Sequence, residues 1–144
     1  MMASRLVLAA LVVGVAGCVS FSVSLPSNGI AARWDVSSGG LRPAGLEDHL
    51  NGTSLPTPET AFSIRLRNGR VIRSTDMKGV GGPTFRPLKG DPSASRLAER
   101  VDGAEMSVGL DDAKSGLHAT WRSISRMRAN YLRQELTLRA AKDD

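Results

Sequence analysis

"WRSISRMRANYLRQELTLRAAKDD", residues 121–144, shows the secondary structure of this chain most clearly. From residue 132 onward, every second side chain falls on one face of an extended backbone: Leu132, Gln134, Leu136 and Leu138. The side chains between them, from Arg133 to Arg139, are charged or polar. Because a period of two is typical of a half-buried strand, residues 131–139 are predicted to form a strand, joined to an earlier strand by a turn.

The same alternation recurs along most of the chain. It is found in residues 30–36 (IAARWDV), 62–67 (FSIRLR), 104–110 (AEMSVGL) and 117–121 (LHATW). Turn-forming stretches such as SSGG at 37–40 and DDAKSG at 111–116 separate these segments. Since no segment holds a long apolar pattern of helical period, we predict an all-β, antiparallel β-sandwich.

The other segments are less regular. Residues 41–52 contain Pro43 and are predicted to form an edge or bulged strand. A two-residue turn at Asn68–Gly69 would place Ile64 opposite Arg73, so the hairpin over residues 62–74 is expected to have a bulge or a longer loop. Residues 53–60 and 78–92 are rich in proline or glycine and are predicted to be loops, with a short helical turn in residues 93–100.

The N-terminus, MMASRLVLAALVVGVAGCVS, has the features of an export signal. Arg5 precedes an apolar run, Leu6–Val15, that is too short to span a bilayer. The sequence VAGC at 15–18 resembles the bacterial lipobox. This resemblance implies a signal peptide over residues 1–17, peptidase recognition through Val15, Ala16 and Gly17, and a lipid on Cys18.

The alternative at this end of the chain is ordinary secretion with cleavage near Ala16. Cys18 is the single cysteine of the chain, and its place in the lipobox favours the lipoprotein. Residues 18–29 are rich in serine and are predicted to be a tether. The expected location is the bacterial cell envelope, at the outer membrane, because Val19 and Ser20 lack the aspartate associated with inner-membrane retention.

The charge of the chain is a second source of functional hypotheses. With 144 residues the chain is long enough for one domain, and its formal net charge is +5. The arginines are scattered singly through most of the chain, which argues against a nucleic-acid partner. Polyanion binding remains a third hypothesis, and it predicts an affinity that falls steeply with salt.

A search for chemistry finds few candidate residues. His49 and His118 are the only histidines, so a structural zinc site is excluded by ligand count, and no cofactor is expected. Asp111 and Asp112 offer too few oxygens for Ca²⁺ and are expected to be solvated. The aromatic candidates for stacking on a sugar are Trp34, Trp121 and Tyr131, although both tryptophans share a face with aliphatic residues and are expected in the core.

The order of segments from Ile30 to Ala140 resembles a known family of domains. RWDVSSGGLRPAGLEDHLNGTSLP, FSIRLRNGRVIRSTDMKG, ASRLAER and WRSISRMRANYLRQELTLRA are similar to the opening of galactose-mutarotase-like β-sandwich domains. Such domains stand N-terminal to the catalytic barrel in bacterial secreted glycosidases related to α-galactosidases. The resemblance implies a mutarotase-like supersandwich over residues 30–144, truncated on its C-terminal side, with a glycoside hydrolase as the parent family.

The resulting functional expectation is a non-catalytic segment of a carbohydrate-active protein, with a carbohydrate-binding or scaffolding role. No catalytic residue is carried over, because those of the family lie on the barrel, so the sequence leaves the enzyme question open. The alternative is a stand-alone envelope lipoprotein that binds a glycan or a protein. The expected partners are a membrane, through the lipid on Cys18, a carbohydrate, and a second copy through an unpaired sheet edge.

Overall fold

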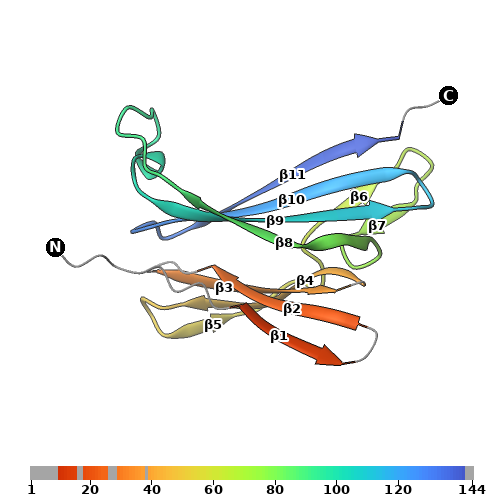
Figure 1. Cartoon of the computed structure of the whole chain (residues 1–144), viewed down its shortest axis with the longest axis horizontal. Helices are drawn as coiled ribbons and strands as arrows, with labels where there is room; N and C mark the ends of the chain where they lie inside the picture. The colour runs from red at the N-terminus through yellow and green to blue at the C-terminus, as the bar shows by residue number, and fades with distance from the viewer. Residues whose placement is uncertain (1–9, 16–17, 26–28, 38, 142–144) are drawn as a thin grey trace.

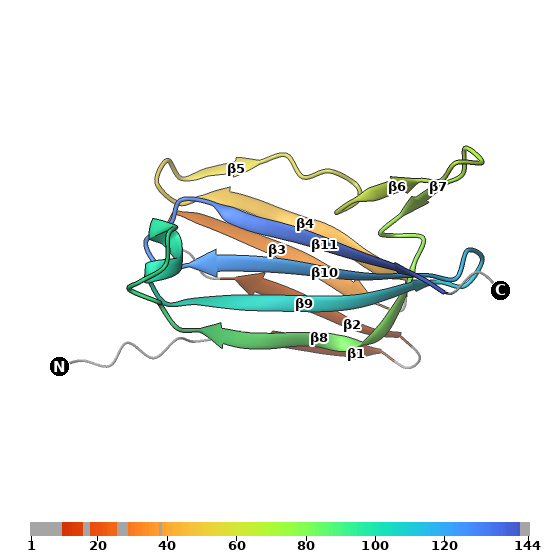
Figure 2. The ribbon, with the colours of Figure 1, turned by 90° about the horizontal axis from the view of Figure 1, so that it is seen from above.

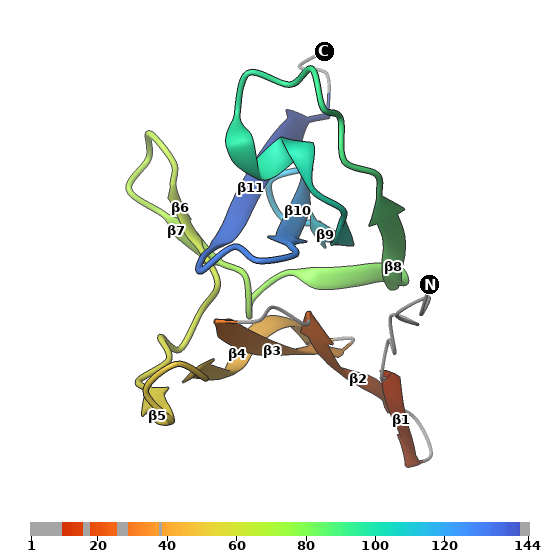
Figure 3. The ribbon, with the colours of Figure 1, turned by 90° about the vertical axis from the view of Figure 1, so that its left-hand side faces the viewer.

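The structure, a computed structural model, describes residues 10–15, 18–25, 29–37 and 39–141. Within these ranges there is no α-helix, and every sheet is antiparallel. The predicted all-β, antiparallel fold class is therefore confirmed. Its strands lie in two facing layers that form a sandwich-like arrangement, as Figures 1 and 3 show.

The first layer is a five-stranded sheet in the order β1-β2-β3-β4-β5. Its strands are β1 (Ala10–Val15), β2 (Cys18–Leu25), β3 (Ile30–Ser37), β4 (Gly40–Asp48) and β5 (Thr53–Leu55). The second layer is a four-stranded sheet in the order β11-β10-β9-β8. Its strands are β8 (Lys78–Leu88), β9 (Gly103–Asp112), β10 (Leu117–Arg126) and β11 (Leu132–Ala140).

A separate hairpin of β6 (Ser63–Arg65) and β7 (Val71–Arg73) completes the strands of the described residues. Figure 2 shows it at the end of the layers where β11 ends and β9 turns into β10. Ile64 pairs with Ile72, so five residues, Leu66–Arg70, connect the strands. This register confirms the longer loop predicted here, because two isoleucines now lie opposite one another instead of an isoleucine and an arginine.

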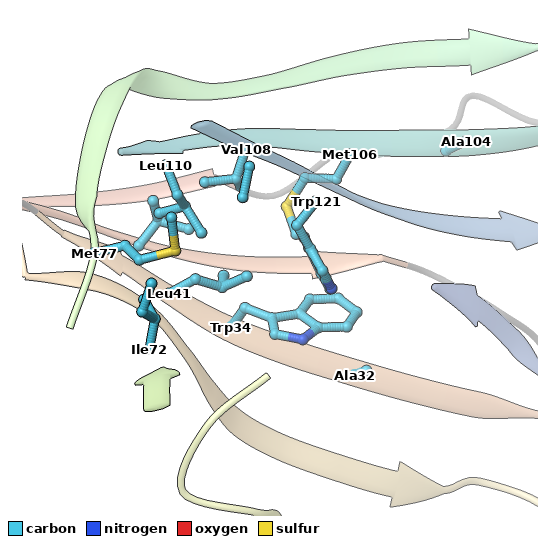
Figure 4. Packing of buried hydrophobic residues seen from close by; sticks show 12 residues of the cluster. Ala32, Trp34, Leu41, Ile72, Met77, Ala104, Met106, Val108, Leu110 and Trp121 are labelled. Carbon is cyan, nitrogen blue, oxygen red and sulfur yellow. The ribbon is translucent and has the colours of Figure 1, made fainter. Parts of the chain in front are cut away.

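The core lies between the two layers (Figure 4). β3 contributes Trp34 and Val36, while β9 contributes alternate residues, Met106, Val108 and Leu110, all at most 2% exposed. The remaining members of the buried cluster are Ala32, Leu41, Ile72, Met77, Ala104, Ala119 and Trp121. Full burial of an aliphatic side chain of this size contributes about 1.5–3 kcal/mol. The period-two faces read from the sequence are thus the faces that pack together.

Residues 78–88 were predicted to be a loop, and this prediction is wrong. They form β8, which pairs with β9 on both sides of a register shift between Val80 and Thr84. Pro83 lies within that shift, and Pro87 lies on a strand with one neighbour only. An edge strand tolerates proline because one of its sides makes no ladder bonds, so the local composition concealed a strand that β9 stabilises.

Three smaller expectations can also be checked. Residues 53–55 are not loop but a short strand, β5, with Leu55 opposite Leu46. β4 has a register shift opposite Arg33 and Trp34, next to Pro43, which confirms the predicted bulge. The helical turn predicted within residues 93–100 is a 3-10 turn, η1 (Leu97–Arg100).

Candidate functional site

A cleft of about 350 Å³ opens between the two layers beside the start of β11. We call it the inter-sheet cleft. Its walls come from four segments of the chain: Ile30, Ala32, Arg33 and Trp34 of β3; Pro43, Gly45 and Leu46 of β4; Pro58 and Ala61 before β6; and Tyr131, Leu132 and Gln134 at β11. Most of these side chains are apolar or small, so the cleft has a largely apolar lining.

Near Tyr131, the backbone at Gly29 makes a close contact with the side chain of Asn130. Gly29 lies against the Asn130 side chain so tightly that a Cβ on residue 29 would be 2.6 Å from Asn130 Oδ1. Asn130 belongs to the turn between β10 and β11, in which Arg128 has a φ of 64°. The contact fixes this turn, and Tyr131 after it, against the start of β3.

Aromatic side chains lie at two depths in the cleft. Trp34 is only 2% exposed and packs edge-to-face on Trp121, with ring centroids 5.1 Å apart. Tyr131 is 49% exposed. The expectation that both tryptophans belong to the core is confirmed, which leaves Tyr131 as the aromatic residue accessible to a ligand.

The inner face of β10 and β11 also carries polar groups beside the cleft. The indole Nε1–H of Trp121 donates to Gln134 Oε1 at 3.4 Å, a long hydrogen bond. Ser123 lies opposite Gln134 in the ladder and is fully buried. Its hydroxyl has no hydrogen-bond partner among the described residues. Gln134 is therefore weakly engaged, and a polar group in the cleft can compete for it.

Asp112 is a structural residue and not the solvated turn carboxylate that we expected. It is 7% exposed, and Arg70 Nη2 lies 2.8 Å from each of its carboxylate oxygens. Ser115 donates its hydroxyl at 2.5 Å and its backbone N–H at 3.1 Å. The Ser115 hydroxyl and then the Arg70 guanidinium hold the pKa of the Asp112 carboxyl below its ordinary value, against the effect of burial. These bonds tie the β6–β7 hairpin to the β9–β10 turn.

Other charged residues form a network on the outer face of the second sheet. Glu105 is 8% exposed and lies 3.0 Å from Arg86 and 3.7 Å from Arg122. Arg122 also pairs with Glu135, and Arg133 lies 2.5 Å from Glu135. Both carboxylates have cationic partners, so this network gives Glu105 and Glu135 a structural role.

The described residues contain no group of three or more His, Cys, Asp and Glu side chains able to hold a metal ion. His118 Nδ1 lies 2.5 Å from Asp111, and His49 lies 3.5 Å from Glu47. Neither histidine lines the inter-sheet cleft.

The predicted lipobox lies only partly within the described residues. Val15 is the last residue of β1 and lies opposite Cys18, the first residue of β2. Ala16 and Gly17 lie outside the described residues. The predicted signal peptide and lipid attachment stay predictions, whereas residues 18–25 of the predicted tether form β2, which pairs with β1 and β3. In the part of the chain that the structure covers, no helix has the length and apolar character needed to cross a bilayer.

Comparisons with protein-family models, with curated proteins and with solved structures find no match to this chain. The mutarotase-like resemblance therefore stays a prediction, and the candidate site stands on its geometry alone.

Proposed function

We propose that this chain is an exported, lipid-anchored, non-catalytic β-sandwich of a carbohydrate-active protein, and that it binds a carbohydrate in the inter-sheet cleft. The anchor rests on the lipobox at residues 15–18, where the single cysteine occupies the position that receives the lipid. Acyl chains hold a protein on a membrane because each buried methylene contributes about 0.8 kcal/mol.

The observation that carries the binding role is the combination of Tyr131 and Gln134 at one apolar cleft. A sugar ring has an apolar face that packs on an aromatic ring and hydroxyl groups at its edge that need hydrogen bonds. Tyr131 offers the exposed ring, and Gln134 offers both a donor and an acceptor. The volume of about 350 Å³ suits a small ligand.

The same lining supports a role without catalysis. Glycoside hydrolysis ordinarily requires two carboxyl groups on either side of the scissile bond. Arg33 is the one charged residue among the described residues that line the cleft. Binding in this cleft would thus place a sugar against a ring, an amide and a guanidinium, with no acid to protonate a leaving group.

Ligand binding is tested by titrating the full chain with monosaccharides and following tryptophan fluorescence, because Trp34 lines the cleft. Tyr131→Ala removes the ring and is expected to weaken binding about tenfold, in keeping with an aromatic contact of about 0.5–1.5 kcal/mol. Tyr131→Phe keeps the ring and should bind almost as well. The binding role is wrong if no monosaccharide changes the tryptophan fluorescence of the protein and the protein changes no monosaccharide's own NMR spectrum.

Lipidation is tested separately, by expressing the chain in bacteria with labelled palmitate. We expect the unsubstituted protein to carry the label and the Cys18→Ser variant to carry none. A secreted, unlabelled chain would instead support ordinary secretion with cleavage near Ala16.

A further inference from the structure

The free edge of β11 differs from the other edge of the same sheet. Within the described residues, β11 pairs with β10 alone and β8 with β9 alone. β8 contains Pro83 and Pro87 and a register shift, which are features that protect an edge from pairing. β11 has no proline and pairs with β10 without interruption from Leu132 to Ala140. Its other side therefore presents a regular row of backbone donors and acceptors.

The side chains of this strand also favour burial. Leu136 lies opposite Trp121 and Leu138 lies opposite Ala119, so both leucines point to the core side of the sheet. They nevertheless remain 37% and 44% exposed. The hairpin β6–β7 lies on the same side of the molecule as β11 (Figure 3), yet it forms no ladder with it.

We propose that two copies of this chain pair through β11, antiparallel and edge to edge, with Thr137 on the two-fold axis. Opposite residues in a ladder lie on the same face of a sheet. On β11 the even-numbered residues lie on the inner face, so even-numbered residues of one copy must lie opposite even-numbered residues of the other copy. In a symmetric antiparallel pair this requires that one residue, called the centre below, lies opposite its own counterpart on the two-fold axis. The choice is then among a few centres.

Charge selects among the centres that keep most of the strand paired. A centre at Leu136 would place Arg133 opposite Arg139, and a centre at Glu135 would place that carboxylate opposite itself. Like charges directly opposite one another destabilise a ladder. A centre at Thr137 places Glu135 opposite Arg139 and Leu136 opposite Leu138, each twice in the dimer. The sequence of β11 is thus complementary to itself in this register.

A centre at Leu138 would pair only Leu136–Ala140 within β11 and form no pair of opposite charges. A centre at Gln134, which would place Arg133 opposite Glu135, is the remaining competitor. It would pair only Leu132–Leu136 within β11, because the preceding turn leaves the extended conformation at Arg128, with a φ of 64°. It would also use two residues that already bind each other within one copy, at 2.5 Å. Arg139, in contrast, makes no ion pair with any described residue. The Thr137 register gives that guanidinium a partner in Glu135, which also binds Arg122 and Arg133 of its own copy.

The state of association is measured on the full chain carrying Cys18→Ser, by sedimentation over a range of concentrations. A monomer–dimer equilibrium is expected. Arg139→Glu would place two carboxylates opposite each other and should raise the dimer dissociation constant at least about tenfold. Lys114→Glu makes the same change in charge at an exposed position of the β9–β10 turn and should leave dimerisation unchanged. A chain that stays monomeric throughout would overturn the proposal.

The register has its own test by oxidative cross-linking. Thr137→Cys, in the same Cys18→Ser background, places two thiols opposite one another and should yield a disulfide-linked dimer. Gln134→Cys places its two thiols about 20 Å apart in this register, because six residues separate them along the strand at about 3.4 Å each. This variant should therefore form no disulfide-linked dimer. Preferential cross-linking through residue 134 would refute the Thr137 axis.

Discussion

The indole of Trp34 meets the indole of Trp121 edge to face, with ring centroids 5.1 Å apart and ring planes at 64°. One ring belongs to β3 of the first sheet and the other to β10 of the second (Figure 4). Aromatic pairs prefer this geometry because the positive edge of one ring faces the negative face of the other. The contact joins the two layers, and Trp34 also lines the inter-sheet cleft.

Removing one member of this pair should destabilise the protein strongly. Trp121 is 1% exposed, so Trp121→Ala leaves a large void, and we expect a loss of about 3–5 kcal/mol in the free energy of unfolding. Urea denaturation followed by circular dichroism measures it. Leu97→Ala is the control, because Leu97 is 76% exposed and should matter by less than about 0.5 kcal/mol. Equal effects of the two changes would contradict this account of the core.

Two buried serines should respond in opposite ways to the same substitution. Ser74 donates its hydroxyl to the Leu41 carbonyl at 2.7 Å and accepts the Ala61 N–H at 2.9 Å. Ser74→Ala leaves these two groups unsatisfied and should cost about 1–3 kcal/mol or more. Ser123→Ala removes a buried hydroxyl that has no partner among the described residues and should be neutral or stabilising. Thermal unfolding of both variants decides the point, and a cost at Ser123 would show a partner there.

Gly40 should not tolerate a side chain. Its φ is +100°, and a Cβ at this position would lie 2.2 Å from the Ser74 carbonyl oxygen. Gly40→Ala therefore combines a strained backbone conformation with a clash, and we expect it to cost at least about 2 kcal/mol. Gly52→Ala is a matched control, because Gly52 also has a positive φ but no atom within 4 Å of the Cβ position. Comparison of the two unfolding midpoints separates the clash from the backbone strain.

Acid should weaken the docking of the β6–β7 hairpin through Asp112. The folded state lowers the pKa of this carboxyl, chiefly through the Ser115 hydroxyl and Arg70. The unfolded chain then binds a proton at a higher pH than the folded chain, so stability is present above about pH 3.9 and declines as pH falls through the folded-state pKa. Asp112→Asn should cost stability at neutral pH and flatten this acid decline. Denaturation across pH measures both effects, and a constant difference between the proteins would contradict the linkage.

The strands whose signals are local were predictable from the sequence. Residues 104–110 and 117–121 alternate apolar and polar side chains, and their core faces match β9 and β10. Residues 78–88 were not predictable, because their glycines and prolines favour a loop and only β9 supplies the bonds that make them a strand. Asp112 was misjudged for a related reason, since Arg70 comes from a hairpin far away in the sequence.

By itself the sequence determined the fold class, the turns and the two tryptophans of the core, because period-two alternation and turn-forming residues act over a few neighbouring positions. Tertiary structure alone decided the inter-sheet cleft and the exposed edge of β11. Ile30 and Tyr131 line one cleft although they lie far apart in the sequence. Such a site exists only after two sheets have stacked, since β3 and β4 of the first sheet supply one wall and the start of β11 in the second sheet supplies another.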